Sequence, residues 1–88
     1  MNVRFKKTFF KDRDRLIPDM QSKVDELVFD VFPKLKRLSD LPNIKDIKGH
    51  KGYFRARIGA YRVGFESNGD EIVIHRVLHR REIYRYFP

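Results

Sequence analysis

Two short turns in the second half of the chain constrain the fold more than any other feature of the sequence. Gly59-Ala60 and Asn68-Gly69 are residue pairs typical of the two-residue turns of β-hairpins. The segments around them, residues 53–58, 61–66 and 72–79, alternate apolar and polar side chains with the period of a β-strand. The sequence therefore predicts three antiparallel strands joined in chain order, and two-residue turns fix which residues face each other.

The predicted register gives this sheet one apolar face. The facing pairs are Phe54–Phe65, Ala56–Val63 and Ile58–Tyr61 across the first turn, and Phe65–Ile72 and Val63–Ile74 across the second. We expect helices from the first half of the chain to cover this face. Arg76 falls on the same face, so either its side chain reaches solvent at the end of the sheet or a β-bulge shifts the strand.

The opposite face is predicted to carry a row of cations. Arg57 faces Arg62 and Arg62 faces His75, while Arg55 and His79 flank this row. Because like charges that face each other across strands destabilise a sheet, a cationic row without a carboxylate indicates an anion-binding site. Screening of an exposed row by water and salt is the alternative explanation.

The first half of the chain is predicted to be mostly helical. We expect, in chain order, a short strand at residues 3–6, a helix from about 8 to 16, a second helix from about 19 to 32, and a loop from 35 to 47. Thr8 and Asp19 can cap the two helices, and the apolar side chains of the second helix form a single stripe. Pro18 should end the first helix, and Pro33 should end or kink the second.

The charge balance indicates an anionic partner. The sequence has 20 Lys and Arg against 12 Asp and Glu, a net charge of +8 at pH 7 in 88 residues. Such an excess points to a nucleic acid or an acidic polypeptide. All cations after Lys51 are arginines, and all tyrosines lie after Gly52. Arginine suits bidentate phosphate binding and base stacking, so this half favours a nucleic-acid surface over one that is merely charged.

The length and composition also limit the setting in which the protein works. A chain of 88 residues supports one domain, residues 1–88. The absence of cysteine suits a reducing cytosol. Apolar runs no longer than four residues are far below the roughly 20 that span a bilayer, and the N-terminus has no apolar signal region. We therefore expect a cytoplasmic protein with no membrane partner.

Motifs for several common chemistries do not occur in the sequence. Gly49-His50-Lys51-Gly52 has the wrong spacing for a phosphate-binding P-loop and precedes a strand. The three histidines lack the spacing of metal ligands, and the carboxylates are scattered. No serine lies near a histidine or in a nucleophile-elbow sequence. We predict a site that uses neither a metal nor a small-molecule cofactor.

Two stretches of the sequence resemble one protein family. Residues 47–65, IKGHKGYFRARIGAYRVGF, resemble the L-x-G…Y-R-x-R-x-G-x-Y-R-V core of RelE/ParE-superfamily toxins, and residues 79–84, HRREIY, resemble the H-R-x-x-x-Y ending of the RelE-like branch. The resemblance spans nearly the whole chain. It implies an α+β fold of the RelE type: two antiparallel N-terminal helices packed on a twisted antiparallel sheet of about four strands, and a short C-terminal helix.

The resemblance implies the toxin of a toxin–antitoxin pair, which cuts messenger RNA on the ribosome and is neutralised by an acidic antitoxin. In this chemistry the 2′-hydroxyl of the RNA attacks the adjacent phosphodiester without a metal and leaves a 2′,3′-cyclic phosphate. The reaction needs a base, an acid and cations that stabilise the transition state. The resemblance assigns Arg62, Arg80 and Tyr84 to catalysis, and we add Arg57 and His79 to the expected catalytic residues.

The identity of the base is where this sequence departs from the family. Arg55 and Arg57 stand where well-studied RelE members carry lysines, and arginine is a poor base because it stays protonated. We expect the base among His79, His75 and Tyr84, with His79 preferred and Tyr84 also suited to stacking. The side chains expected to bind RNA or the ribosome are Lys48, Lys51, Arg55, His75, Arg81 and Arg85.

Two other functions stay open from the sequence. A ParE-like inhibitor of DNA gyrase would bind a protein enzyme and do no chemistry itself, and the His79, Arg80 and Tyr84 ending argues against it. A non-catalytic basic module that binds RNA or the ribosome, including a decayed toxin, is the other alternative. Arginine in place of lysine at positions 55 and 57 keeps that alternative open.

Overall fold

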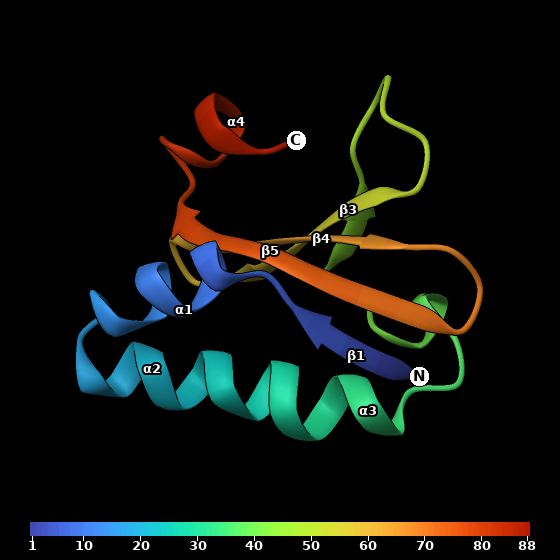
Figure 1. Ribbon diagram of the computed structural model, residues 1–88, viewed down its shortest axis with the longest axis horizontal. Coiled ribbons are helices and arrows are strands. Elements are labelled where there is room, and N and C mark those ends of the chain that lie inside the picture. Colours follow the sequence, from blue (N-terminus) through green and yellow to red (C-terminus); the bar gives the residue numbers. More distant parts are fainter.

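The protein folds into one β-sheet that contains both parallel and antiparallel strand pairs, with helices on both faces of the sheet. The computed structural model describes residues 1–88, and its elements in chain order are β1 (Asn2–Phe5), α1 (Lys7–Asp14), α2 (Pro18–Asp25), a π-helical segment (Glu26–Val31), α3 (Phe32–Lys34), a 3₁₀ turn (Leu38–Asp40), β2 (Ile44–Asp46), β3 (Tyr53–Ile58), β4 (Tyr61–Ser67), β5 (Glu71–His79) and α4 (Ile83–Tyr86). Figure 1 shows α2 and α3 below the sheet and α4 above it. The predicted α+β class is confirmed. No helix is long and apolar enough to cross a membrane.

The sheet has five strands in the order β1-β5-β4-β3-β2. The antiparallel run β3-β4-β5 confirms the predicted hairpins, but two features of the sheet differ from expectation. β1 pairs with β5 in parallel, and β2 forms an additional antiparallel edge strand within the stretch predicted to be a loop. β2 is only three residues long, too short to give an alternating pattern.

The register of the first hairpin is as predicted, whereas that of the second is not. Phe54 faces Phe65, and Arg57 faces Arg62. In the second hairpin the connection is longer than two residues, so that Ser67 pairs with Ile72 rather than with Asp70, and a β-bulge follows at Gly64 and Phe65. The bulge exchanges the two faces of β5 beyond His75.

The longer connection and the bulge together correct three predicted neighbours. Arg62 faces Leu78 instead of His75, Phe65 faces Ile74 instead of Ile72, and Val63 faces Val77 instead of Ile74. Arg76, which was out of place in the predicted register, pairs with Gly64 on the other face. The alternative in which a bulge shifts the strand is therefore the correct one for Arg76.

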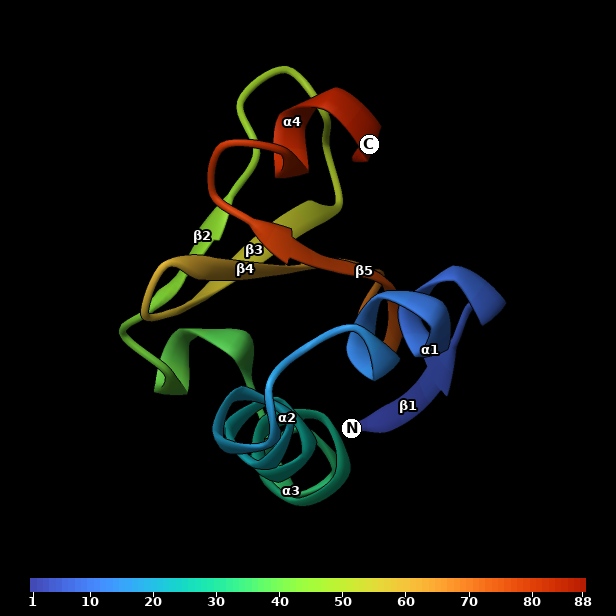
Figure 2. The ribbon, with the colours of Figure 1, turned by 90° about the vertical axis from the view of Figure 1, so that its left-hand side faces the viewer.

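The apolar face of the sheet is covered by the helices, as predicted. Val24, Val28 and Phe32 are fully buried on one stripe of the continuous helical segment, and Figure 2 shows that segment end-on beneath the strands. The sheet contributes the other large part of this core: Ala56, Val63, Phe65, Ile72, Ile74 and Val77. Apolar burial of this kind is the main source of stability in a domain of this size.

The helix ends differ in detail from the predicted caps. Thr8 does not cap α1; its hydroxyl donates to the carbonyl oxygen of His75 at 2.8 Å. Pro18 begins α2 at its first position, where a missing N–H costs nothing, and Asp19 lies in the first turn rather than at the cap. The helix continues one residue past Pro33 to Lys34.

Beyond the end of β1, helix α1 contacts the edge of β5 that β1 leaves unpaired. The last β1 pair is Phe5 with Ile74. Beyond it, the carboxylate of Asp12 accepts the backbone N–H of Val77 at 3.2 Å. The same carboxylate accepts two hydrogen bonds from Arg76, at 2.7 and 3.0 Å. Asp12 is the one buried charged side chain, and it fixes α1 to the sheet.

Candidate functional site: an arginine cluster beside the C-terminal helix

Four arginines gather on the face of the sheet that α4 covers in part. Arg57 on β3 faces Arg62 on β4, and Arg55 faces Gly64. The pKa of Arg62 is lowered, first because burial disfavours its charge and next because Arg57, Arg55 and Arg80 are positively charged. None of these side chains takes part in any ion pair of the protein. We call Arg55, Arg57, Arg62 and Arg80 the arginine cluster.

The first tight turn holds the centre of the arginine cluster in place. Nη1 of Arg62 donates to the carbonyl oxygens of Gly59 and Tyr61 at 2.9 and 2.8 Å. The backbone N–H of Arg80 donates to the carbonyl oxygen of Ala60 at 2.8 Å. One hairpin turn therefore positions both Arg62 and the segment that leads into α4. Arginine stays protonated even with a lowered pKa, so the cluster remains cationic.

Tyr84 on α4 completes this group of side chains. Its ring centroid lies 5.6 Å from Cζ of Arg55, the geometry of a cation–π contact. Tyr84 also acts on the pKa of Arg62, in the direction opposite to the arginines. The side chain is 55% exposed, so one surface of the phenol is available to a ligand.

Helix α4 is anchored by two buried side chains and by one aromatic contact. Ile83 and Phe87 form a small second core with Ile47. The Phe87 ring lies directly on Gly64, where an added Cβ would come within 2.5 Å of Cδ2 of Phe87. Only glycine at position 64 lets the ring approach this closely. On the other side, Cζ of Arg76 lies 5.4 Å from the ring centroid of Tyr86, which connects α4 to the Asp12 carboxylate.

The predicted placement of His79 is wrong. Because of the bulge, His79 faces Tyr61 rather than the arginine row, and the two rings lie edge to face with centroids 5.5 Å apart. Its Nδ1 accepts the backbone N–H of Arg81 at 3.2 Å. Tyr61 faces Ile58 on the helix side of the sheet, so the His79 ring points away from the arginine cluster.

His75 lies on the expected face but not beside Arg62. Its Nε2 is 2.8 Å from Oε1 of Glu66, and its ring packs against Phe87 with centroids 5.3 Å apart. The His75 side chain keeps 22% exposure beside this ring. The carboxylate of Glu66 is its hydrogen-bond partner, so His75 forms part of the packing under α4 and not of the cationic row.

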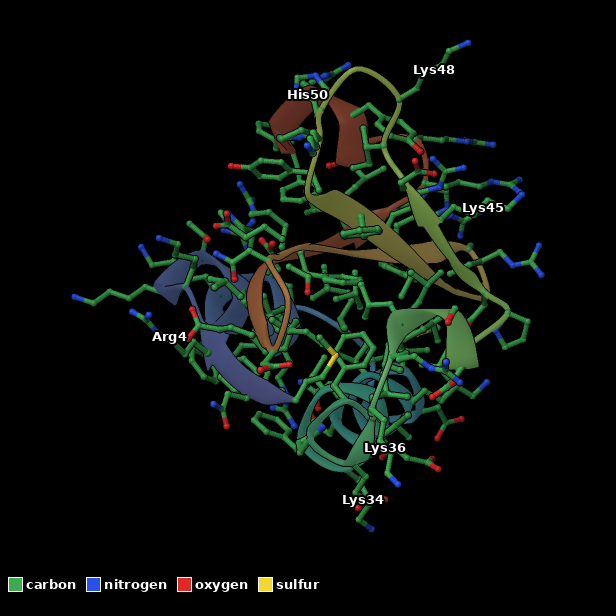
Figure 3. The ribbon with its side chains drawn as sticks, turned by 90° about the vertical axis from the view of Figure 1, so that its right-hand side faces the viewer. Arg4, Lys34, Lys36, Lys45, Lys48 and His50 are labelled. Atoms are coloured by element: carbon green, nitrogen blue, oxygen red, sulfur yellow. The ribbon has the colours of Figure 1, made fainter.

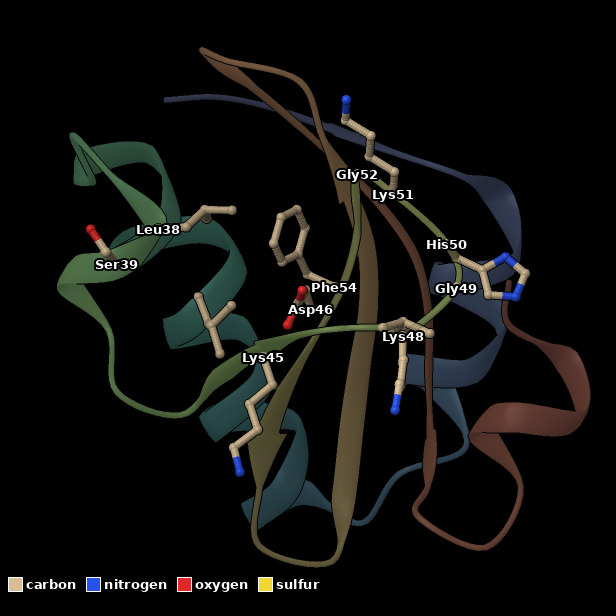
Figure 4. Close-up of a pocket in the computed structure, with 12 residues that line it drawn as sticks. Leu38, Ser39, Lys45, Asp46, Lys48, Gly49, His50, Lys51, Gly52 and Phe54 are labelled. Atoms are coloured by element: carbon tan, nitrogen blue, oxygen red, sulfur yellow. The ribbon is translucent and has the colours of Figure 1, made fainter.

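The remaining predicted binding residues lie outside the arginine cluster. Lys48 lines a hollow of about 450 Å³ that also includes Arg55, Tyr84 and Phe87. Lys51 lines a larger hollow of about 960 Å³ along β2, whose apolar floor includes Leu38, Ile44 and Phe54 (Figure 4). Arg81 and Arg85 are exposed. The larger hollow contains no member of the arginine cluster, so we place the functional site at the smaller one.

His50 is the one titratable side chain at the smaller hollow that the sequence analysis did not select as a site residue. It lines the same hollow as Arg55 and Tyr84, although it lies in the loop between β2 and β3. Figure 3 shows His50 beside α4. The signal available in the sequence was a histidine between Gly49 and Gly52, but only the folded loop shows that it lines the same hollow as Tyr84. No group of three or more His, Asp or Glu side chains is arranged to hold a metal ion.

Comparison with known proteins identifies the family. A family model described as the ParE toxin of the type II toxin–antitoxin system matches residues 3–84. Toxin RelE3 of Methanocaldococcus jannaschii is 44% identical over 89 residues, which cover 100% of both chains. The chain is a RelE-like member of the type II toxin family. The expected resemblance is thereby confirmed over the whole chain.

Solved structures of RelE-like proteins share the fold. The toxin–antitoxin complex RelB–RelE from Methanococcus jannaschii matches with a TM-score of 0.81 and 41% identity over 98% of this chain and 100% of that one. The RelBE2 complex from Mycobacterium tuberculosis matches with a TM-score of 0.70 and 30% identity over 90% and 96%. The isolated RelE toxin of E. coli, at 12% identity and a TM-score of 0.67, shares the fold.

Proposed function

We propose that the protein is an endoribonuclease toxin that cuts messenger RNA on the ribosome. The observation that carries this proposal is the arginine cluster itself, in which three other arginines lie around Arg62 with no carboxylate partner and with Tyr84 at their edge. A phosphodiester supplies the negative charge that this cluster lacks. Arginine forks match phosphate oxygens in pairs, which orients the group as well as binding it.

The reaction that fits this site is attack by the 2′-hydroxyl of the RNA. The 2′-oxygen forms a bond to phosphorus while the bond from phosphorus to the 5′-oxygen breaks, which leaves a 2′,3′-cyclic phosphate and a 5′-hydroxyl. Arg62, Arg57 and Arg80 would stabilise the charge that develops on the phosphoryl oxygens. Tyr84 would contact the RNA through its exposed phenol. One proton leaves the 2′-oxygen and one reaches the 5′-oxygen, so the reaction is balanced without a cofactor.

The same surface gives a reason to expect an acidic antitoxin. The cluster and the net charge of +8 favour a partner of opposite charge, and the solved relatives include RelB–RelE and RelBE2 complexes. We propose that a cognate acidic antitoxin neutralises this protein in the cytoplasm. Charge complementarity would speed their association and make it sensitive to salt.

Mapping of message ends in cells tests the proposed function. The protein is induced, and translated messages are analysed by primer extension next to an Arg62→Ala variant. We expect new 5′ ends within translated regions, in register with codons, that disappear in the variant. Intact messages together with DNA damage would favour the gyrase inhibitor instead. Intact messages and intact DNA, with the protein bound to ribosomes, would favour a non-catalytic RNA-binding module.

A further inference from the structure

We propose that His50 is a further catalytic residue, the group that takes the proton from the attacking 2′-hydroxyl. This inference rests on the proposed cleavage reaction. It gives the site the base that the arginines cannot supply. It also moves this role from β5, where the sequence placed it, to the loop between β2 and β3.

His50 shares one hollow with Arg55, the member of the arginine cluster that contacts Tyr84. The hollow of about 450 Å³ is lined by His50 and Lys48 on the loop, Arg55 on β3, and Tyr84 and Phe87 in the C-terminal segment. The loop rises next to α4 on the side of the sheet away from the long helix (Figures 2 and 3). A phosphodiester bound by Arg55 would therefore lie between an imidazole and a phenol.

The loop is built to hold His50 in a fixed place. The N–H of His50 donates to the carbonyl oxygen of Ile47 at 3.1 Å, and the carbonyl oxygen of His50 accepts from the N–H of Tyr53 at 3.1 Å. Gly49 and Gly52 both have φ of +85°, a conformation that other residues rarely adopt. Two consecutive turns thus fix the backbone of His50 on both sides.

The loop is also attached to the helix that carries Tyr84. Ile47, at the start of the double turn, is only 7% exposed and packs with Ile83 and Phe87. These two residues are the ones that anchor α4. Because a single small core positions both His50 and Tyr84, their separation is set by packing and not by the path of a free loop.

The other titratable groups at this place are unsuited to accept the proton. The titratable side chains that line the larger hollow together with His50 are Lys45, Asp46, Lys48 and Lys51. Those that line the smaller hollow with it are Lys48, Arg55 and Tyr84, and the ring centroid of Tyr53 lies 6.5 Å from that of His50. None of the side chains that line the smaller hollow is a carboxylate. An imidazole is the side chain that ordinarily exchanges protons near neutral pH. His75 and His79 each commit a ring nitrogen to another group.

The proton transfers balance with Tyr84 as the partner. His50 takes the proton of the 2′-hydroxyl as the 2′-oxygen bonds to phosphorus. The 5′-oxygen leaves with the proton of the Tyr84 hydroxyl. The imidazolium then returns its proton to the tyrosinate through solvent, so both residues are restored and no other reactant is needed.

The test is a pH series of single-turnover cleavage on ribosomes programmed with a defined message, at saturating protein. His50→Gln should lower the rate by roughly 10²–10⁴-fold, the range for loss of an acid–base group, and should remove the fall in rate at acidic pH. The His50→Ala variant should recover part of its rate when free imidazole is added. Lys23→Gln is the control, because Lys23 lies on the exposed side of α2. This variant should cleave at the rate of the wild type. His79→Gln should retain the acidic limb.

The outcomes separate this inference from the proposed function. If the wild type cleaves and His50→Gln keeps its rate and its acidic limb, the inference is overturned while the proposed function stands. A rate that falls equally at every pH, without rescue by imidazole, also overturns it, because it indicates a binding or structural role. If the wild type cleaves neither ribosome-bound nor free RNA, the proposed function fails and the inference fails with it.

Discussion

Removal of the Asp12 carboxylate should be the most destabilising single change outside the apolar core. Asp12 is 4% exposed and accepts three hydrogen bonds, two from Arg76 and one from the backbone of Val77. In Asp12→Ala the Val77 N–H stays buried without a partner, because α1 still covers this edge of β5. Arg76 at the same time loses its only carboxylate.

The magnitude follows from these contacts. A buried N–H without a partner costs about 1–3 kcal/mol, and loss of a hydrogen-bonded charge pair costs about 1.5–3 kcal/mol. The Arg76 side chain keeps 23% exposure, so water compensates for part of the second loss. Alanine returns about 0.5 kcal/mol through its higher helix propensity. We therefore expect a loss of about 3 kcal/mol, out of a total free energy of unfolding of about 4–13 kcal/mol for a chain of this length.

Urea and thermal unfolding followed by circular dichroism measure this loss. At about 4–8 °C per kcal/mol for a domain of this size, the melting temperature should fall by roughly 12–24 °C. Asp14→Ala is the matched control: Asp14 is on the same helix, its side chain is 73% exposed, and it contacts Arg13 at 3.5 Å. Its melting temperature should barely change. A loss below about 1 kcal/mol in Asp12→Ala would refute the view that this carboxylate holds α1 to the sheet.

Three further predictions concern the site. Arg62→Ala should lower the single-turnover cleavage rate by roughly 10²–10³-fold, as for loss of one transition-state donor, and a variant as toxic as the wild type would contradict its central role. Cleavage should persist in excess EDTA when polyamines keep the ribosome intact, and a strict need for a protein-bound divalent ion would count against the arginine mechanism. Gly64→Ala should displace the Phe87 ring, lower the free energy of unfolding by about 1–3 kcal/mol through overpacking and slow cleavage. In a Phe87→Ala background the same substitution should lower the free energy of unfolding much less, and equal effects in both backgrounds would show that the ring is not involved.

Much of the fold was available from local signals in the sequence. The turn at Gly59-Ala60 is short enough that pairing across it follows by counting, and the observed register of β3 and β4 is the predicted one. The stripe from Val24 to Phe32 likewise identified the helix that covers the apolar face. These elements depend on neighbours in the chain, so the sequence contains their determinants.

The parts that were missed depend on contacts between distant segments. The bulge at Gly64 and Phe65 is stabilised where α1 and α4 meet β5, through Asp12 and Phe87. In the sequence, the only indication of this bulge was that the predicted register placed Arg76 on the apolar face. Because one extra residue reverses the faces of a strand, this single feature removed His79 from the predicted site. His50 was missed because it lies in a loop, where no helix or strand periodicity predicts the direction of a side chain.

The parallel pairing of β1 with β5 makes the completed fold depend on two strands that lie far apart in the sequence. β1 is made first, yet its partner is the last strand to be made, and Asn2 aligns with Glu71. Closing so long a loop is slow and gains nothing until β5 is present. In a chain that still lacks β5, β1 has no strand to pair with and α1 has no strand edge to bind. Such a chain also contains neither Arg80 nor Tyr84. The site proposed for cleavage therefore exists only in a chain in which β5 and the segment that carries Arg80 and Tyr84 have been made and folded against the earlier elements.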